Sequence, residues 1–506
     1  MKYIGKTDPY DHQREAFQKT APLIYAALFM EQGTGKTKVA IDRTVYNFER
    51  GKIQVGIVIC PKSLTDTWIE EIATHCPDRA NPTIALWDAS LNKNTVSQLE
   101  TVCYNKDPKK LCWLIINIEG IRTPKSNKLI HWMLRHFKCH VIVDESSKIK
   151  SHNAKQSEAA HSIGDYSTAR TILTGTPVGN SPADYFSQLR FLMGSPLGHS
   201  NFYSFRATYC ELETKQIKLP GGKWALNPET GKKEYSKLRK VVEIIGVKNS
   251  DQLKKQLLPF SFFVKKADCL DLPPKIYHER TCALSKEGMR LYKDISKQIV
   301  TEIRENEYIT VEIALSKLLR LQQVVGGFLP SDDDPDAIAI PGPNPKIDLL
   351  LETIEQFPGP SLIWSRFKAE HIAILKLLKA ITHPSRIGEI TGRIKKNERE
   401  DTRRAFQRGA VDYIVCTQSC AGYGYTLTAA VNEFYYSNTF SHEQRVQSED
   451  RAHRISLTHD VNIVDLFCPV PGARIDVDMK LKESLRIKKD MADMLTDVSD
   501  LMRSTA

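Results

Sequence analysis

The sequence predicts an α/β protein with two lobes, each built on a parallel sheet. In the first half, short β-branched runs recur, and each is followed by a turn and a helical pattern. This alternation is typical of parallel sheets, and the second half of the chain repeats it. The expected strands of the first lobe are VGIVICP, CWLIIN, CHVIVDE and TILTGTP, starting at Val55, Cys112, Cys139 and Thr171, and those of the second are SLIWS, DYIVCT, EFYYS and VNIVDLF, starting at Ser361, Asp412, Glu433 and Val461.

The domain organisation follows from where this alternation is interrupted. We expect residues 1–200 to form the first lobe and residues 346–470 the second. Residues 201–345 differ in character, because LPGGKWALNPETGKKEY has the pattern of a hairpin and SKLLRLQQVVGGFL that of a helix. We therefore predict an insertion between the lobes, followed after the second lobe by a C-terminal segment, residues 471–506.

Composition and charge indicate a soluble globular protein. The 506 residues are 41% hydrophobic and 26% charged, and 71 Lys and Arg exceed 60 Asp and Glu by 11. This excess fits a polyanionic partner and fits a solubilising surface equally well. No stretch approaches the roughly 20 apolar residues that cross a bilayer. We expect an intracellular protein without membrane contact, located in the cytoplasm, or in the nucleus of a host that has one.

The eleven cysteines are scattered along the chain and form no paired C-x-x-C clusters. Their odd number in a large chain without a signal peptide favours reduced thiols. Cys416 and Cys420 are the closest pair, but no second pair of ligands lies nearby in the sequence. We therefore expect no metal bound by cysteine.

The segment FMEQGTGKTKVA, from Phe29 to Ala40, predicts a nucleotide-phosphate loop. Glycines at 33 and 35 let the backbone curl, so that N–H groups including that of Thr34 face a phosphate. Lys36 would neutralise the β- and γ-phosphate oxygens of ATP, and Thr37 would ligate Mg²⁺. The alternative is a glycine turn that is followed by a lysine without this function. The cofactor-binding residues expected in this segment are Gly33, Thr34, Gly35, Lys36 and Thr37.

A second motif, HVIVDESS, ends a buried strand with Asp144 and Glu145. A carboxylate beside a phosphate loop holds Mg²⁺, and a second one orients or deprotonates the attacking water. We expect Asp144 to serve the metal and Glu145 the water. The strand TILTGTP in the same half ends in the hydroxyls of Thr174 and Thr176, which adds weight to this assignment.

The second half contributes QRVQSEDRAHRI, which places Arg451 and Arg454 three residues apart, as on one face of a helix. Gln447 lies one turn before Arg451. An arginine that reaches a γ-phosphate stabilises charge in the transition state. The alternative is a surface helix whose arginines pair with its own acidic residues, Glu443, Glu449 and Asp450.

Together these segments resemble the Swi/Snf-type ATPases of helicase superfamily two. The resemblance covers nearly the whole chain and runs in the family's order. YDHQREAF resembles the adenine-reading motif, which implies that role for Gln13, and AGYGYTLTAA resembles motif V, which implies nucleotide contact by Gly424. The remaining matches are FMEQGTGKT, VICPKSLTDTWIEEI, DESSKIK, LTGTPVGNSPADYFSQLRFL, IWSRF, GRIKKNEREDTRRAFQ and EDRAHRI, with DCLDLPPK at the linker and ARIDVDMKLKESLRIKKDMADML as the closing helix.

Three positions depart from the family pattern. Met30 replaces the small residue that opens motif I and is expected to crowd the loop without removing its N–H groups. Ser147 replaces the histidine of the Asp-Glu-x-His box, so coupling between ATP and motif III must use other contacts. Ser456 stands where the family continues with Gly-Gln after motif VI.

The resemblance implies two RecA-like lobes that bind ATP and Mg²⁺, close and reopen, and so move along duplex DNA. We expect nothing beyond the motor, which resembles bacterial and bacteriophage members and favours remodelling of branched DNA in recombination, repair or replication. We expect a monomer on double-stranded or branched DNA, with recombination or replication proteins as further partners. The expected sequence-independent DNA contacts are Lys62, Ser63, Asn117, Thr174, Gly422 and Arg399, with Gly422 to Gly424 in motif V.

Two other functions remain open from the sequence. A strand-separating DNA or RNA helicase shares the two lobes but needs a wedge that splits the duplex. A nucleotide-gated binding protein without turnover would lack Lys36, Glu145 or an arginine finger, all of which are present here.

Overall fold

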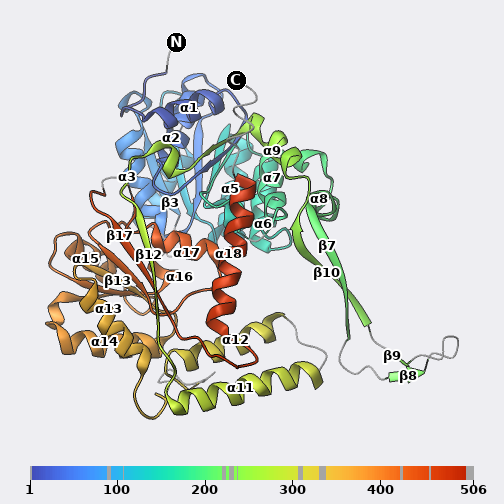
Figure 1. Cartoon of the computed structure of the whole chain (residues 1–506). Coiled ribbons are helices and arrows are strands. Elements are labelled where there is room, and N and C mark those ends of the chain that lie inside the picture. Colours follow the sequence, from blue (N-terminus) through green and yellow to red (C-terminus); the bar gives the residue numbers. More distant parts are fainter. Residues whose placement is uncertain are drawn as a thin grey trace. The chain divides into compact units, whose positions relative to one another are not determined.

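The computed structural model describes residues 3–87, 93–105, 107–179, 181–218, 224–226, 233–235, 238–305, 311–329, 338–421, 425–454 and 457–496 (Figure 1). The chain divides into two compact units. The first comprises Met1–Glu211, Gly246–Leu272 and Lys488–Ala506, and the second comprises Leu212–Ile245 and Pro273–Ile487.

The first unit is built on a sheet of seven described strands in the order β11-β1-β6-β5-β2-β4-β3. Every neighbouring pair in it is parallel. The carboxyl ends of parallel strands share one edge of a sheet, so the loops after β1, β6 and β5 are neighbours there. The strands are β1 (Tyr25–Met30), β2 (Val55–Cys60), β3 (Thr83–Trp87), β4 (Cys112–Asn117), β5 (Cys139–Asp144), β6 (Ala169–Leu173) and β11 (Ser261–Val264).

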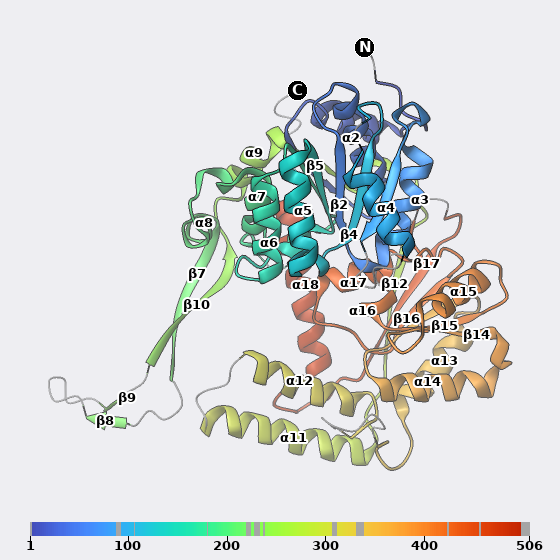
Figure 2. The ribbon, with the colours of Figure 1, turned by 180° about the vertical axis from the view of Figure 1, so that it is seen from behind.

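Helices cover both faces of the first sheet, so its central strands are buried on both sides. One face packs against α2 and α3 through residues such as Val39 and Trp68. The other packs against α5, α6 and α7 through Met133, Ile163 and Leu189, and Figure 2 shows these three helices side by side. The helices are α1 (Asp11–Thr20), α2 (Lys36–Glu49), α3 (Thr65–His75), α4 (Lys93–Cys103), α5 (Pro124–His136), α6 (Lys155–Asp165), α7 (Asp184–Met193), α8 (Phe202–Tyr209), α9 (Ser250–Leu257) and α10 (Lys266–Cys269).

The second unit has its own sheet, in the order β12-β17-β16-β13-β15-β14, again with every described pair parallel. One part of its core joins α13 and α14 to this sheet, and another joins α11 and α12. The elements are β12 (Lys275–Thr281), α11 (Lys286–Glu305), α12 (Val311–Val325), α13 (Pro345–Gln356), β13 (Ser361–Trp364), α14 (Lys368–Ile381), β14 (Ile387–Ile390), α15 (Lys396–Gln407), β15 (Tyr413–Cys416), α16 (Gln418–Ala421), β16 (Asn432–Tyr435), α17 (His442–Glu449) and β17 (Val461–Phe467). Helix α18 (Val477–Thr496) begins in the second unit, and its residues from Lys488 belong to the first.

The predicted α/β class with two parallel sheets is confirmed, and all eight strands predicted for the two lobes are present. The predicted hairpin forms β8 (Trp224–Leu226) and β9 (Lys233–Tyr235), which pair antiparallel. The predicted helices of the insertion and the C-terminus correspond to α12 and α18. A further two-stranded sheet joins β7 (Cys210–Lys218) to β10 (Leu238–Val247).

Four strands of the two main sheets were not predicted: β3, β11, β12 and β14. All four lie at the edges of their sheets. β3, β12 and β14 are only partly buried, so they lack the continuous apolar run that marks a central parallel strand, and β11 is only four residues long. β11 and β12 come from the range expected for the insertion, residues 201–345, yet each completes one of the main sheets.

Candidate nucleotide site

The loop between β1 and α2 has the backbone of a phosphate cradle. Gly33 and Gly35 have φ values of 82° and 81°, in the left-handed region that favours glycine. A Cβ atom at position 35 would lie 2.0 Å from Nε2 of Gln13, so a side chain is excluded there by contact as well as by conformation. Gly35 is the N-cap of α2, a helix of 14 residues, and Lys36 and Thr37 are in its first turn. The cradle therefore opens at a helix N-terminus, where backbone N–H groups favour an anion.

Two side chains of α1 hold this loop from outside. The carbonyl oxygen of Thr34 accepts a hydrogen bond from Nε2 of Gln13 at 3.1 Å and lies 2.8 Å from Nε2 of His12. Oε1 of Gln13 accepts from the backbone N–H of Tyr10 at 3.1 Å. In this structure Gln13 thus fixes the loop, and its predicted role in reading adenine stays a prediction. His12 was not predicted from the sequence.

Lys36 lies close to the acidic end of β5. Its side chain is only 8% exposed, and Nζ lies 3.4 Å from the carbonyl oxygen of Glu31. Burial raises the pKa of Asp144 above its ordinary value, and the charge of Lys36 opposes that increase. Trp68 on α3 donates from Nε1 to Oδ2 of Asp144 at 2.8 Å. The phosphate-loop lysine and the candidate metal carboxylate therefore belong to one buried electrostatic cluster.

Glu145 occupies a strained position directly after β5. Its φ and ψ are 51° and 56°, a left-handed conformation that non-glycine residues seldom adopt. The side chain is buried, and its Oε1 accepts from Nε2 of Gln32, in the phosphate loop, at 3.4 Å. Strained residues of this kind cluster at active sites, where the surrounding structure holds them in place. The hydrogen bond from Gln32 joins the phosphate loop directly to Glu145 of the carboxylate pair.

Met30 does not point into the cradle. It is the last residue of β1, fully buried, and belongs to the apolar core that contains Val39 and Ala40 of α2. Its unusual size relative to the family motif is therefore accommodated in the core.

The loop after β6 lies against the phosphate loop. A Cβ atom at Gly175 would lie 3.1 Å from the backbone nitrogen of Gln32 and 3.3 Å from Cα of Glu31, so the two backbones are in close contact. Thr174 is fully buried, and its hydroxyl accepts from the backbone N–H of Thr176 at 3.1 Å. The hydroxyl of Thr174 therefore shapes the loop, and in this structure it has no surface to offer to DNA.

The second unit carries the two predicted arginines, but not on a helix. Helix α17 ends at Glu449, and Arg451 and Arg454 lie in the turns that follow, so their placement on one helical face was wrong. Arg451 is 1% exposed and donates from Nε to the carbonyl of Gln447 at 2.8 Å and from Nη1 to that of Tyr425 at 3.2 Å. Arg454 donates from Nε to the carbonyl of Asp450 and from Nη1 to the hydroxyl of Thr426, both at 3.0 Å.

The alternative of an exposed helix is also wrong, because α17 buries most of its charged residues. Arg445 donates to Asp465 and, at 2.8 Å, to Glu449, while Lys275 donates to Glu449 and Asp450 at 3.1 and 3.2 Å. Although burial opposes ionisation, Lys275 and Arg445 lower the pKa of Glu449 to about 2. The remaining predicted member, Gln447, is also buried, and its amide lies 3.5 Å from Oε1 of Glu443.

The predicted DNA contacts are in different settings. Lys62 and Ser63 are exposed on a 3₁₀ turn, Lys62–Leu64, directly after β2. Asn117 ends β4, and its Oδ1 accepts from the N–H of Gly120 at 2.5 Å. Arg399 on α15 is half-buried, with Nη1 2.7 Å from Sγ of Cys420. Gly422 and Gly424, like the departure at Ser456, lie outside the described residues.

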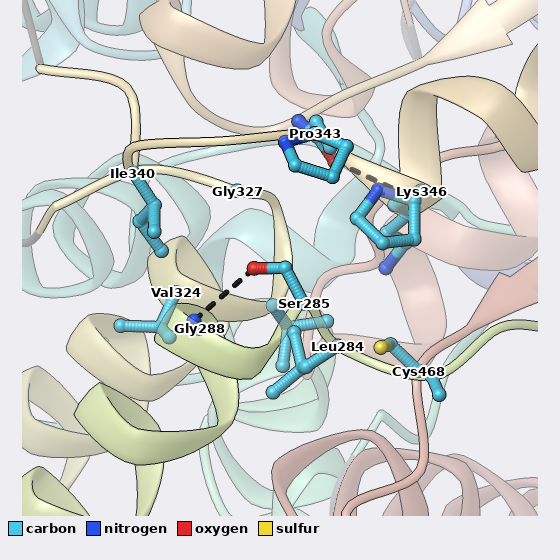
Figure 3. Close-up of a pocket in the computed structure, with 13 residues that line it drawn as sticks. Leu284, Ser285, Gly288, Val324, Gly327, Ile340, Pro343, Lys346 and Cys468 are labelled. Atoms are coloured by element: carbon cyan, nitrogen blue, oxygen red, sulfur yellow. Dashed lines mark hydrogen bonds between the residues drawn. The ribbon is translucent and has the colours of Figure 1, made fainter.

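A pocket in the second unit, shown in Figure 3, is too small to hold a nucleotide. Its volume of about 10 Å³ is at the lower limit for one water molecule. It is enclosed by the start of α11, the end of α12 and the turn before α13, with Lys346 and Cys468 in its wall. No cluster of metal-ligating side chains and no helix long and apolar enough to cross a membrane is found in the part of the chain that is described.

Comparison with known proteins is consistent with this arrangement. The model of the SNF2-related domain matches residues 24–326, more than half of the chain. The chain belongs to the SNF2-related family. A second model, the helicase conserved C-terminal domain, matches residues 345–456. The predicted membership in the Swi/Snf-type ATPases of helicase superfamily two, and with it the enzyme class of a helicase-type ATPase, is confirmed at the level of the family.

Individual relatives are distant. The chain is 26% identical to the DNA annealing helicase and endonuclease ZRANB3 of Homo sapiens over 86% of this chain and 36% of that protein. It is 24% identical to nuclear protein STH1/NPS1 of Saccharomyces cerevisiae over 86% of this chain and 31% of that protein. It thus spans about a third of the length of these curated relatives. Among solved structures, it is 20% identical to the SWI2/SNF2 ATPase core of Sulfolobus solfataricus in complex with dsDNA, with a TM-score of 0.40, covering 99% of this chain and 100% of that chain.

Proposed function

We propose that this chain is an ATP-dependent translocase on double-stranded DNA that remodels branched DNA by branch migration or fork reversal. The observation that carries the ATPase part is the cradle in the first unit. Gly33 and Gly35 shape it, Lys36 lies beside Asp144, and Gln32 links it to Glu145. These groups fit a nucleotide phosphate with Mg²⁺, because N–H donors, one cation and two carboxylates converge at one edge of the sheet.

Each residue then has a defined part in hydrolysis. Lys36 and the N–H groups of the loop bind the phosphate oxygens, and Thr37 and Asp144 would hold Mg²⁺, which would supply further positive charge there. Glu145 accepts a proton from the attacking water. Arg451 and Arg454 supply positive charge in the transition state. Gln13 reads the adenine, and Gln447 and Gly424 take part at the nucleotide.

The DNA part rests on the family and on the relatives' names, one of which is a DNA annealing helicase. Exposed Lys62 and Ser63 contact the phosphate backbone of DNA, together with Asn117, Arg399 and Gly422, independently of sequence. In branch migration, base pairs are exchanged nearly one for one, so the pairing energy is close to balanced and ATP supplies direction. Simple unwinding must overcome about 1.4 kcal/mol of stacking per step. We propose that the protein works inside the cell as a monomer on DNA.

The experiment compares ATP hydrolysis with single-stranded, duplex, forked and four-way DNA, and then the processing of three matched substrates. These are a mobile four-way junction, a fork with homologous arms and a tailed partial duplex. We expect stimulation by duplex and branched DNA and faster processing of the junction and fork. Faster processing of the tailed duplex would favour a strand-separating helicase, and absence of ATP hydrolysis would leave only nucleotide-gated binding.

A further inference from the structure

The carboxylate motif of the first unit has Ser147 where the family has a histidine, and a buried glutamine on α7 contacts the neighbouring residue, Ser146. Ser146, the residue after Glu145, donates from its hydroxyl to Oε1 of Gln188 at 2.7 Å. Nε2 of Gln188 in turn donates to the carbonyl of Pro177 at 2.8 Å. Both Ser146 and Gln188 are 0% exposed. A continuous buried chain of hydrogen bonds therefore runs from the carboxylate motif to the loop after β6.

The amide of Gln188 satisfies both ends of this bridge. Its oxygen accepts from the hydroxyl of Ser146, and its nitrogen donates to carbonyl oxygens on the other side. Nε2 of Gln188 also donates to the carbonyl of Asp184, one turn earlier in α7, at 2.9 Å, which sets the direction of the amide. A carboxylate lacks the donor, and an apolar side chain lacks both groups.

The loop at the far end of the bridge is itself well defined. It begins with Thr174, whose hydroxyl holds the N–H of Thr176. It passes Gly175, whose backbone lies against Gln32 of the phosphate loop. It is held further on by the N–H of Gly179, which donates to Oδ2 of Asp184 at 2.9 Å. A shift of this loop would therefore act on the phosphate loop directly and on Glu145 through Gln188.

We propose that Gln188 is a positioning residue that couples the loop Thr174–Pro177 to the hydrolytic carboxylates, in the place of the missing histidine at 147. This inference rests on the proposed function, because it assigns to Gln188 the transmission of DNA binding to ATP hydrolysis. Gln188 contacts no reacting atom, and it acts by holding Ser146, and with it the backbone of Glu145, in register with Pro177.

The test measures the ratio of DNA-stimulated to DNA-free ATP turnover, using linear duplex DNA. Gln188→Met has similar volume and removes both hydrogen-bonding groups, and Ser146→Ala removes the donor at the other end. We expect each variant to lower the ratio by about tenfold, a normal size for coupling between two sites, without a matching change in the KM for ATP. The double variant should be no worse than either single one, because both changes break the same chain.

Gln156→Met is the matched control. Nε2 of Gln156, on α6, donates to the carbonyl of Lys148 at 3.2 Å, so it bonds the same turn after Glu145 from another helix. This variant should retain the wild-type ratio. Melting temperature reports on the fold of all four variants, and Ser146→Ala keeps the proposal testable if Gln188→Met does not fold.

Each outcome supports or overturns the proposal. A ratio within twofold of wild type in folded Gln188→Met and Ser146→Ala would overturn it. An equal fall of both turnover rates, with the ratio unchanged, would mean that Gln188 is structural only. A wild-type enzyme that DNA does not stimulate would overturn the proposed function together with the inference, whereas stimulation that survives in the variants overturns the inference alone.

Discussion

Each of the two units is built on its own parallel sheet, but the units position their charged residues in different ways. In the first unit, backbone geometry does this: two left-handed glycines shape the loop and a strained residue, Glu145, follows β5. In the second, side-chain charges do it: Arg445 and Lys275 form a buried ion-pair network with Asp465, Glu449 and Asp450. The comparison teaches that the first site adds steric precision of the backbone to its buried charges, Lys36 and Asp144, whereas the second is held by buried ion pairs.

The largest expected effect is that of Lys36→Ala in the first unit. It removes the cation beside the phosphate oxygens, so we expect ATP hydrolysis to fall to the level measured without enzyme. Phosphate release and nucleotide binding are measured on protein whose melting temperature confirms folding. Near-normal turnover would overturn the assignment of the phosphate loop.

In the second unit, Arg451→Ala should lower kcat by about 10³-fold, with a smaller effect on nucleotide affinity, because such a charge acts mainly on the transition state. Arg454→Ala should act in the same direction. Arg451→Lys is the control that retains charge without the forked donor geometry. If Arg451→Ala changed only the KM for ATP, the arginine would bind the ground state and the proposed role would be wrong.

Glu145→Gln tests the first unit, where the backbone positions the catalytic side chain, because Glu and Gln have similar side-chain volumes. We expect a fall in kcat of about 10²-fold or more, because water loses its proton acceptor. ATP binding should persist, since Lys36 is unchanged and the amide oxygen of the new glutamine can still accept the hydrogen bond from Gln32 of the loop. Binding can be measured by calorimetry or fluorescence. Loss of ATP binding in this variant would count against a role confined to water activation.

The smallest effect concerns stability, and it tests the claim that charge dominates in the second unit. Burial and the nearby charge of Glu449 raise the pKa of Glu433 on β16 from 4.5 to about 8, despite the hydrogen bond from Trp364 and the charges of Lys275 and Arg445. The folded state therefore binds this proton more tightly than the unfolded chain. The resulting stability is complete below about pH 4.5 and is lost as the pH rises through about 8.

We therefore expect the melting temperature of the wild type to fall between about pH 4.5 and pH 8, where stability decreases by about 1.4 kcal/mol per pH unit, and we expect Glu433→Gln to flatten this fall. Glu355→Gln, at an exposed position on α13, is the control and should leave the wild-type slope unchanged. An unchanged slope in Glu433→Gln would show that the charge of Glu433 does not limit the stability of this unit.

The difference between local and non-local signals explains which features could be predicted. The central strands could be predicted from the sequence because strands that are buried on both faces are continuously apolar. The edge strands β3, β12 and β14 have solvent on one side, and their mixed pattern resembles a loop. The end of α17 at Glu449 was missed because spacing alone continues a helix until a turn is recognised.

At the candidate site, some residues are marked by a short local pattern, whereas others depend on partners far away in the sequence. Gly33, Gly35 and Lys36 lie within four positions, so their pattern is present in a short segment. Trp68 lies within a recognised motif, but its bond to Asp144 spans 76 positions. Gln188 likewise lies within a recognised segment, LTGTPVGNSPADYFSQLRFL, but its bond to Ser146 spans 42 positions, so the sequence does not show the pairing.

The sequence by itself determined the α/β class, the glycine loop before α2, the position of the acidic pair and the family, because each depends on backbone conformation or burial over a few adjacent residues. Only the tertiary structure decided which strands close the sheet edges, how Arg451 and Arg454 are held, and which side chains link the phosphate loop, Glu145 and the loop after β6. The physical reason is that a buried hydrogen bond or ion pair needs its partner at contact distance. In this chain the order of the strands in the sheet, rather than separation along the sequence, decides which residues come into contact.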